Sequence, residues 1–404
     1  MQRDYDVAIV GGGVIGSTLA CAIAASSLRI ALLESQQTPA GTSHSNRDGR
    51  SFALAVSSKN MLDALGVWEK LGKFSVAIKN IHISERGKFG VMRVNCQEHG
   101  SEGLGYLVPA ERLALVLHEY MSQHQNIERI QPYMVSGIQT HAEKVMLYGE
   151  GATIEAKLLI AADGTHSFIR KELGIPVDEK PYGQTAVVGN IGVTDYQPHT
   201  AYVRFTAQGP LVLVPRSDNC YGFIWTNPTK AALEHLALSE KEFSVRLQQA
   251  FGFRLGHFCR LGKRYSYPLS LKVSQRLVSQ RTVLIGNAAQ TLHPVAAQGL
   301  NLAFRDIAEL SELLHGNKHA LDDISEMLHS YESKRQSDIK HTVMLTHRLN
   351  FLFSTGNPVL TQVRGIGLAL LGAVPVLENQ ILQHSSGTLS SSVKILQGRA
   401  LQYS

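Results

Sequence analysis

Three glycines and one acidic residue near the N-terminus have the spacing of a dinucleotide-binding site. Gly11, Gly13 and Gly16 form the pattern G-x-G-x-x-G directly after the apolar run 7–10, and Glu34 follows Gly16 by 18 residues. In this pattern the first glycine allows a tight turn, the second lets the backbone approach a pyrophosphate, and the third lets the next helix pack closely. A carboxylate at the position of Glu34 can accept hydrogen bonds from a ribose. These residues predict a site for the phosphates and one ribose of a dinucleotide.

The stretch that contains these glycines has two other interpretations. No charged residue occurs in the 22 residues between Asp6 and Arg29, and a membrane-spanning helix needs roughly 20 apolar residues. The three consecutive glycines and the polar residues near its end disfavour a membrane anchor, and Arg3, which two aspartates balance, disfavours a secretion signal. A buried strand at 7–10, a helix at 17–25 and a second strand at 29–33 explain more of the residues.

A second candidate site follows a buried apolar run at 158–162. Asp163 and Gly164 end this run, and Ser167 and Arg170 come next at helical spacing. A glycine after an aspartate gives a tight turn, and the helix N-terminus beyond it can face a phosphate. The same residues also fit an ordinary strand–turn–helix in which the aspartate caps the helix. Both interpretations stay open on these residues alone.

A third block, TVLIGNAAQTLHPVAAQGLNLAFRD, runs from 282 to 306. Its strand is expected to end at Gly286 and Asn287, and His293 with Pro294 is expected to make a rigid turn. A helix then begins whose backbone N–H groups point out of its end, which suits an electron-rich ring oxygen or a developing negative charge. The residues at this predicted helix start are Gln298, Gly299, Leu300 and Asn301.

The elements that would position these blocks change in type along the chain. Residues 1–178 and 270–350 have the periodicities of one discontinuous α/β domain. Residues 179–269, with part of 75–110, instead contain short β-branched and aromatic runs that predict an inserted, mostly antiparallel β-sheet domain. Residues 351–404 are predicted to form a helical C-terminal segment that contacts a membrane or another subunit.

Length, composition and charge limit the class of protein. A chain of 404 residues with 44% hydrophobic and 18% charged residues is globular and long enough for two or three domains. The net charge of +6 favours anionic partners. No dense Lys/Arg run is interleaved with aromatics, so we expect no nucleic acid partner. The four cysteines are far apart and lack zinc spacing, so we expect reduced thiols, no metal and a cytoplasmic location.

The three blocks, in this order and at these separations, resemble those of the FAD-dependent aromatic hydroxylases, the class A flavoprotein monooxygenases. That family has G-x-G-x-x-G near the N-terminus, D-G-x-x-S-x-x-R in the middle and G-D-A-A-H-x-x-x-P with G-Q-G-x-N later. The resemblance covers about residues 5–350. It implies an α/β fold with an FAD-binding Rossmann-like domain of the aromatic hydroxylase type, an inserted, mostly antiparallel β-sheet substrate domain and a helical C-terminal region.

Shorter segments resemble the branch of this family that acts in ubiquinone biosynthesis. Most of the family has Asp where this chain has Asn287 and His where it has Gln290, and the branch that acts on 2-polyprenyl-6-methoxyphenol has the Asn/Gln form. Asn287 lacks the charge but keeps an acceptor oxygen, so a ribityl or pyrophosphate contact survives. The other segments that resemble this branch are DGRSFAL at 48–54, LGYLVPAERL at 104–113, RFTAQGPLVLVP at 204–215, KRYSYPL at 263–269 and KRQSD at 334–338.

The resemblance implies further contacts to a non-covalently bound FAD. Arg50 would lie over the pyrophosphate or near the flavin ring, the alternative being a loop arginine paired with Asp48. Arg112 would reach the FAD from the start of its helix, and Val135 would contact the adenine through its backbone. His293 and Arg50 are the candidate catalytic residues, and His293 is the nearest base for a phenol, the alternative being a turn element before proline. The full set of predicted cofactor-binding residues is Gly11, Gly13, Gly16, Glu34, Arg50, Arg112, Val135, Asp163, Gly164, Asn287, Gln298, Gly299, Leu300 and Asn301.

The implied activity is ring hydroxylation of a polyprenylated phenol, with NADPH or NADH as reductant and O2 as the oxygen source. From 2-polyprenyl-6-methoxyphenol the product would be the 1,4-benzoquinol, and other ubiquinone-biosynthesis proteins are the expected protein partners. No second G-x-G-x-x-G follows a strand, so no separate nicotinamide domain is expected. The alternatives are a sibling hydroxylase that acts at another ring carbon and a non-enzymatic prenyl-protein-binding module, against which the intact 163–164 and 298–299 blocks argue.

A polyprenylated substrate lies in a bilayer, so we looked for a segment that contacts one. Residues 365–377, GIGLALLGAVPVL, carry no charge, but 13 residues are too few to span. From Lys340 to the end the chain has five Lys/Arg residues and one acid, Glu378. An apolar run flanked by cations predicts a segment that lies on the inner face of a bacterial membrane, with a core helix or a subunit contact as the alternative.

Overall fold

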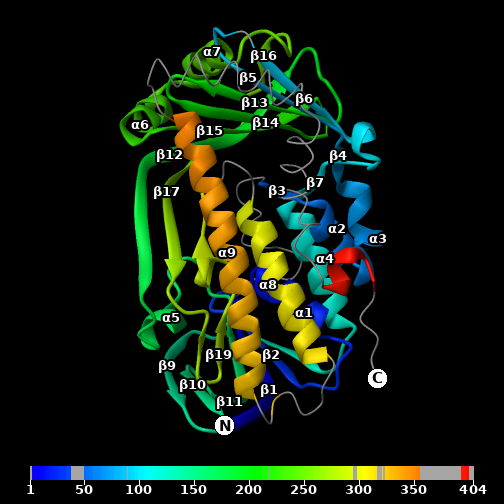
Figure 1. Cartoon of the computed structure of the whole chain (residues 1–404), viewed down its shortest axis with the longest axis vertical. Coiled ribbons are helices and arrows are strands. Elements are labelled where there is room, and N and C mark those ends of the chain that lie inside the picture. The colour runs from blue at the N-terminus through cyan, green and yellow to red at the C-terminus, as the bar shows by residue number, and fades with distance from the viewer. Residues whose placement is uncertain are drawn as a thin grey trace.

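The computed structural model describes residues 2–37, 50–88, 90–217, 219–293, 298–315, 321, 324–354 and 393–399. Two large sheets follow one another along the long axis of the molecule, and one long helix, 324–354, reaches both of them (Figure 1). The segment 365–377 that we expect at the membrane lies outside the described residues, as do Asp48 and Pro294.

The N-terminal strand lies at the centre of a mostly parallel sheet. β1 (Gln2–Val10) pairs in parallel with β2 (Ile30–Leu33) and β11 (Thr153–Ala161). Val7 to Val10 are buried, as expected for a continuous apolar run in a parallel strand that is covered on both faces. β8 (Ile127–Ile130) and β19 (Thr282–Leu284) extend the sheet in parallel, and β9 (Val135–Thr140), β10 (Val145–Gly149) and β18 (Val278–Ser279) add antiparallel strands.

A nine-stranded, mostly antiparallel sheet forms the other half of the molecule. Its two longest strands, β12 (Val177–Val193) and β17 (Tyr265–Ser274), run side by side toward the first sheet (Figure 1). Each of them crosses one end of the range 179–269, so the division of the chain into domains at these residues stays a prediction. The other strands are β5 (Asn80–Glu85), β6 (Val91–Asn95), β13 (Thr200–Thr206), β14 (Gly209–Pro215), β15 (Cys220–Pro228), β16 (Phe258–Cys259) and β20 (Gln290–Thr291).

Helices and a small third sheet fill the space around these two sheets. α1 (Val14–Ala22) follows β1 and packs against α4 (Ala110–Ser122) and α8 (Gln298–His315). The small sheet consists of β3 (Ser51–Leu54), β7 (Gly105–Pro109) and β4 (Val76–Ile78). The remaining helices are α2 (Val56–Ala64), α3 (Trp68–Leu71), α5 (Phe168–Glu172), α6 (Thr229–Ala237), α7 (Glu240–Phe251) and α9 (Ile324–Ser354), with 3-10 turns at Gly72–Phe74, Cys96–His99, Gly286–Ala288 and Lys394–Gln397.

A buried ionic network joins α8 to α9. Arg335 on α9 donates from Nε to Asp306 Oδ1 on α8 at 2.7 Å, and Arg305 donates to Asp338 at 2.8 Å. Arg335 also pairs with Asp338. The side chains of Arg335 and Asp306 are only 6% and 1% exposed, so each charge depends on its partners rather than on water. α9 itself contacts β18 of the first sheet and β14 of the second, so this network fixes an element that both sheets share (Figure 1).

None of the described helices has a stretch long and apolar enough to cross a bilayer. All four cysteines are free thiols, with Cys21 and Cys96 buried and Cys220 and Cys259 half-buried.

The α8–α9 network yields a stability prediction. Replacing Asp306 by Ala leaves the buried Arg335 guanidinium without one of its two carboxylate partners, which we expect to lower the free energy of unfolding by about 3–5 kcal/mol. Asp63→Ala is the control, because the Lys59–Asp63 pair at 2.8 Å is more exposed and such pairs contribute about 1 kcal/mol or less. Urea denaturation followed by circular dichroism measures both. Equal losses in the two variants would show that the buried network does not carry the stability assigned to it.

Candidate active site

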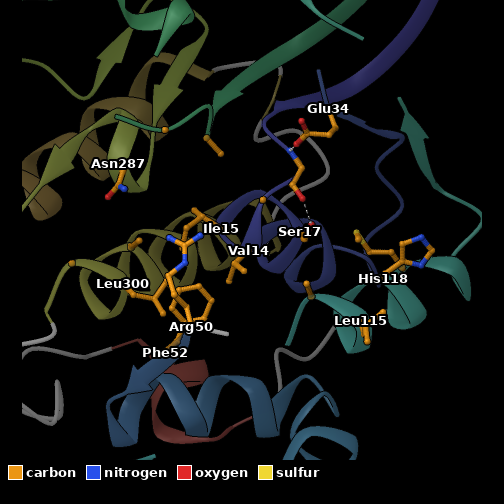
Figure 2. Close-up of a pocket in the computed structure, with 18 of the residues that line it drawn as sticks. Val14, Ile15, Ser17, Glu34, Arg50, Phe52, Leu115, His118, Asn287 and Leu300 are labelled. Atoms are coloured by element: carbon orange, nitrogen blue, oxygen red, sulfur yellow. Dashed lines mark hydrogen bonds between the residues drawn. The ribbon is translucent and has the colours of Figure 1, made fainter. Parts of the chain in front are cut away.

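A cavity of about 540 Å³ opens where β1, β2 and β11 of the parallel sheet end. This is the edge of an open α/β sheet at which ligands bind. Figure 2 shows side chains from widely separated parts of the chain around it, with α1 between Glu34, His118 and Arg50. The residues that line it are Gly12, Gly13, Val14, Ile15, Ser17, Glu34, Arg50, Phe52, Ala114, Leu115, His118, Met121, Arg129, Ala162, Gly164, Asn287, Thr291, Leu292, Gly299, Leu300 and Ala303.

Two of the predicted glycines are required by the fold. Gly11 has φ +110°, and a Cβ there would lie 2.4 Å from the carbonyl oxygen of Ala162. A Cβ at Gly16 would lie 2.0 Å from the carbonyl oxygen of Gly11. Neither residue lines the cavity. Gly11 and Gly16 therefore bring the start of α1 close to β1 and β11, and their effect on a ligand is indirect.

Gly13 and Gly299 have a backbone φ outside the left-handed region. Among the described glycines of this kind, they alone have open space where a Cβ would be. A Cβ built at either position has no neighbouring atom within 4 Å, and both residues line the cavity. Gly13 is the N-cap of α1, with φ −66°, so its backbone conformation suits any residue. Gly299 lies in the first turn of α8. The described protein atoms therefore leave room for a side chain at either helix start. A ligand that approaches the backbone there would need that room, and so would require glycine at both positions.

Glu34 lies at the end of β2, as predicted, and its carboxylate is held by backbone groups. Its two oxygens accept hydrogen bonds from the N–H groups of Gly12 and Gln36, each at 3.0 Å (Figure 2). Arg129 lines the same part of the cavity from the neighbouring strand β8. This end of the cavity thus combines an acceptor suited to ribose hydroxyls with a cation suited to phosphate.

Asp163 and Gly164 occupy the turn between β11 and α5. Asp163 Oδ2 accepts the backbone N–H of Ile169 at 3.2 Å, while Oδ1 is buried with no hydrogen-bond partner among the described residues. Gly164 lines the cavity with φ +84°. Arg170 donates to the carbonyl oxygen of Ala288 at 2.7 Å and so ties this turn to the third block. The aspartate therefore bonds the helix backbone, as in the capping interpretation. It does not itself line the cavity, and its contact with a ligand stays a prediction.

Asn287 is presented by a turn that Asp306 holds in place. Asp306 Oδ2 accepts the backbone N–H of Gly286 at 3.1 Å and the side-chain amide of Gln290 at 2.8 Å. Asn287 lines the cavity between these two anchored residues (Figure 2). Gln290 itself does not line the cavity, so its contribution is to position Asn287.

α8 begins at Gln298, where the sequence predicted a helix start. Gly299 and Leu300 line the cavity, whereas Gln298 and Asn301 do not. The Asn301 side chain accepts from Ala55 N and Ser58 Oγ, both at 2.8 Å, and donates to the Ala53 carbonyl at 3.0 Å. Its amide therefore fixes β3 and α2 against α8, so only its backbone could serve a ligand.

Arg50 lines the cavity beside Leu300 and Phe52 (Figure 2). Its guanidinium carbon lies 5.7 Å from the ring centre of Tyr267 on β17, which belongs to the second sheet. This cation–π distance places a positive charge where the cofactor cavity meets the strands of the antiparallel sheet. Arg50 thus lies at the end of the cavity that is nearest the antiparallel sheet, and its contact with a flavin stays a prediction.

Two predicted contacts are placed elsewhere. Arg112 starts α4 as expected, but its guanidinium stacks on Phe74, 4.5 Å from the ring centre, and the residue does not line the cavity. Val135 is buried in the hydrophobic core, where its backbone pairs with β10, and it does not line the cavity either. A nearby aromatic ring and a strand partner, which the local sequence does not reveal, explain both differences.

His293 is a poor candidate for the base that deprotonates a phenol. Its side chain is buried, its Nε2 lies 3.1 Å from Gln184 Oε1, and its ring meets Tyr182 edge-on at 5.0 Å. Burial lowers its pKa to about 4, so the ring is neutral near pH 7 and binds a proton only weakly. The adjacent Thr291 and Leu292 line the cavity and His293 does not. This histidine holds the turn against β12.

Several lining residues were not predicted from the sequence. One face of α4 supplies Ala114, Leu115, His118 and Met121, and β8 supplies Arg129. The i, i+4 and i+7 spacing of Ala114, His118 and Met121 could have indicated this face. Arg129 could have been found only from the parallel pairing of β8 with β2, which brings it beside the strand that ends at Glu34.

The lining residues fit FAD. Gly13 and Gly299 at the starts of α1 and α8 and the acceptor of Glu34 match the phosphates, ribityl chain and ribose of a flavin dinucleotide. Asp163, next to the lining residue Gly164, has a buried oxygen without a partner among the described residues. Gly13, Glu34, Arg129 and His118 would hold the adenosine diphosphate part. Asn287, Gly299, Leu300 and Arg50 would hold the flavin part.

Comparisons with known proteins agree with this site. The chain matches the FAD binding domain family over residues 4–346. The ubiquinone hydroxylase UbiL of Rhodospirillum rubrum is 30% identical over 387 residues, covering 95% of this chain and 90% of that protein. The 3-demethoxyubiquinol 3-hydroxylase of Escherichia coli is 26% identical over 397 residues, covering 96% and 99%.

A solved structure shares the fold. That of p-nitrophenol 4-monooxygenase PnpA from Pseudomonas putida DLL-E4 matches with a TM-score of 0.79 at 19% identity, covering 95% of this chain and 97% of that one. The predicted α/β fold of the aromatic hydroxylase type and the FAD cofactor are confirmed. The chain belongs to the FAD binding domain family and is an FAD-dependent monooxygenase.

Proposed function

We propose that this enzyme hydroxylates the ring of a polyprenylated phenol in ubiquinone biosynthesis, with NADPH or NADH as reductant and O2 as the oxygen source. The relatives named as ubiquinone-pathway hydroxylases, which align with nearly the whole chain, support the substrate class. The Asn287/Gln290 form of the third block favours 2-polyprenyl-6-methoxyphenol as substrate and the 1,4-benzoquinol as product.

The main support for the proposal is the pair of glycines, Gly13 and Gly299, that have open space at the position of a Cβ. Gly13 and Gly299 lie at the starts of two helices, line one cavity and meet no described protein atom where a Cβ would be. Helix starts carry unpaired N–H groups and a partial positive charge. Glycines at both starts let anionic or electron-rich groups of one long ligand approach the backbone from two sides.

When bound, FAD would supply the redox chemistry that transfers one oxygen atom of O2 to the ring. The residues of this chain bind it, orient it and balance its charge. The N–H groups at the start of α8 would stabilise negative charge on the reduced flavin ring. Asn287, anchored through Asp306, would hold the ribityl chain or pyrophosphate, and Arg50 would add positive charge at the meeting point of cofactor and substrate.

The proposed function has two alternatives, and the experiment must distinguish it from both. The Escherichia coli relative is named a 3-hydroxylase, so a sibling reaction at another ring carbon is the closest alternative. The second is a prenyl-protein-binding module without catalysis. Docking at the inner face of a bacterial membrane and contact with other ubiquinone-biosynthesis proteins remain part of the proposal, because a polyprenylated substrate lies in the bilayer.

The function test is complementation with product analysis. Expressing the chain in a bacterial strain that lacks its 2-polyprenyl-6-methoxyphenol hydroxylase should restore ubiquinone and remove the accumulated precursor, as mass spectrometry of lipid extracts would show. Matched strains that lack the hydroxylases for the other ring carbons serve as controls. Rescue of one of those strains alone would identify the sibling reaction, and rescue of none, with full FAD content, would reject the proposed substrate class.

A second prediction separates binding from folding. Gly13→Val adds atoms only where the ligand would approach, and overpacking of about 1–3 kcal/mol should weaken FAD binding roughly tenfold to hundredfold with the melting temperature of the FAD-free chain unchanged. Gly11→Ala adds a Cβ at 2.4 Å from the Ala162 carbonyl oxygen and should lower that melting temperature. Flavin absorbance per chain and thermal melts measure both effects. Full flavin content in Gly13→Val would exclude this glycine from the site.

A third prediction concerns the amide at position 287. Asn287→Asp keeps an acceptor oxygen and should retain FAD, whereas Asn287→Leu removes the partner and should weaken binding by about 1–3 kcal/mol, or roughly tenfold to hundredfold. Fluorescence titration of the FAD-free chain gives the two dissociation constants. If Asn287→Leu binds FAD as tightly as the parent, the residue does not face the cofactor.

A further inference from the structure

A second cavity, of about 300 Å³, lies at the far edge of the antiparallel sheet and shares no lining residue with the cofactor cavity. Strands β5 and β6 form most of it, and Thr200 at the start of β13 closes one side. Glu98 is the one acidic residue that lines it, and this side chain is exposed. The complete lining is Asn80, Ile81, His82, Arg93, Val94, Asn95, Glu98 and Thr200.

His82 lines this cavity as a buried side chain without a partner. It is 6% exposed, and neither ring nitrogen has a hydrogen-bond partner among the described residues. Its ring packs against Tyr202, with ring centres 5.5 Å apart. Buried polar groups are nearly always hydrogen-bonded, so an imidazole with both nitrogens unpaired needs an explanation. Its N–H can donate to a ligand that enters the cavity.

Three arginines surround His82. Arg93 on β6 is directly opposite His82 in the strand pairing. Arg204 lies two residues beyond Tyr202, the pairing partner of His82 on β13, and therefore points to the same face. Arg254 lies in the loop after α7, and this loop reaches Arg204, because a Cβ at Gly252 would lie 3.8 Å from the Arg204 guanidinium. After burial, the charge of Arg254 is the next largest cause of the lowered pKa of both His82 and Arg204.

These three arginines have no carboxylate ion pair within the part of the chain that the structure describes. Arg204 donates to the Ser84 hydroxyl at 3.3 Å, and its Nε is buried without a partner. Arg93 and Arg254 are exposed and Arg204 is half-buried, and like charges gathered in this way repel one another unless an anion joins them. The missing partner at this edge of the sheet is therefore negative.

We propose that this edge of the sheet binds a phosphate group through His82, Arg93, Arg204 and Arg254. Guanidinium groups match phosphate oxygens in geometry and charge, and a neutral histidine adds one N–H donor. Adding the anion pairs the arginines and gives His82 an acceptor. This site is separate from the proposed hydroxylation, because none of its residues lines the cofactor cavity.

The phosphate has two chemical sources, a free phosphorylated metabolite or a phospholipid headgroup. Phe253 is 67% exposed and directly precedes Arg254. An apolar side chain beside a phosphate site would enter the acyl region of a membrane while the arginines hold the headgroup. The experiment therefore needs one arm for each source.

Inorganic phosphate is the first probe, in calorimetric titrations of the full FAD-loaded chain. We expect Arg93→Ala with Arg254→Ala to weaken phosphate binding about tenfold or more, while flavin content stays unchanged. The matched control removes two exposed cations elsewhere, Lys171→Ala with Arg276→Ala, and should bind phosphate like the parent. No binding by the parent at millimolar phosphate, or equal affinity in the two double variants, would overturn the proposal.

His82→Phe separates a ligand role from a structural one. The phenyl ring fills the space but donates no hydrogen bond, so phosphate affinity should fall about tenfold while the melting temperature of the FAD-loaded chain stays the same or rises. A histidine that serves only packing would leave the affinity unchanged. Parental affinity in this variant would remove His82 from the site and contradict the proposal.

Co-sedimentation with phosphatidylglycerol and phosphatidylcholine vesicles distinguishes the two sources. If inorganic phosphate competes with the anionic vesicles, and Phe253→Ser weakens vesicle binding but not phosphate binding, the site holds a lipid headgroup. If the arginine variant loses phosphate but binds vesicles like its control, the site holds a free phosphorylated metabolite. Each of these outcomes supports the site and names its ligand.

Discussion

The carboxylate of Asp306 connects the elements on which the cofactor cavity depends. Its Oδ2 accepts hydrogen bonds from the Gly286 N–H and the Gln290 amide, and its Oδ1 accepts from Arg335. Gly286 begins the turn that presents Asn287, Asp306 lies on the helix whose start lines the cavity, and Arg335 lies on the long helix that reaches both sheets. Because these charges are buried, removing any one leaves another uncompensated, so the whole arrangement is held in one geometry.

This network also gives a physical meaning to the Asn/Gln form of the third block. Two arginines and two aspartates already balance one another between α8 and α9. The neutral Gln290 adds a donor to Asp306 without adding charge. Asn287 can then face the cofactor as a neutral donor and acceptor. The segment KRQSD, which from the sequence indicated only a branch of the family, supplies Arg335 and Asp338 of this network.

Features that depend on neighbouring residues could be predicted from the sequence, and features that depend on distant contacts could not. The tight turn at Gly11 and the start of α8 at Gln298 follow from local spacing, and the structure shows both. The stacking of Arg112 on Phe74 could not be predicted, because nothing in the segment around Arg112 reveals that ring. Arg129 was missed because its position comes from the pairing of β8 with β2, almost 100 residues apart in the chain.

The FAD content of the purified chain is the decisive quantity, because one cavity, built from three distant blocks, is assigned to one cofactor. Flavin released by heat and measured by its absorbance, relative to protein concentration, gives this number. We expect one FAD per chain after incubation with excess FAD and gel filtration. A correctly folded chain that retains no flavin under these conditions would contradict it.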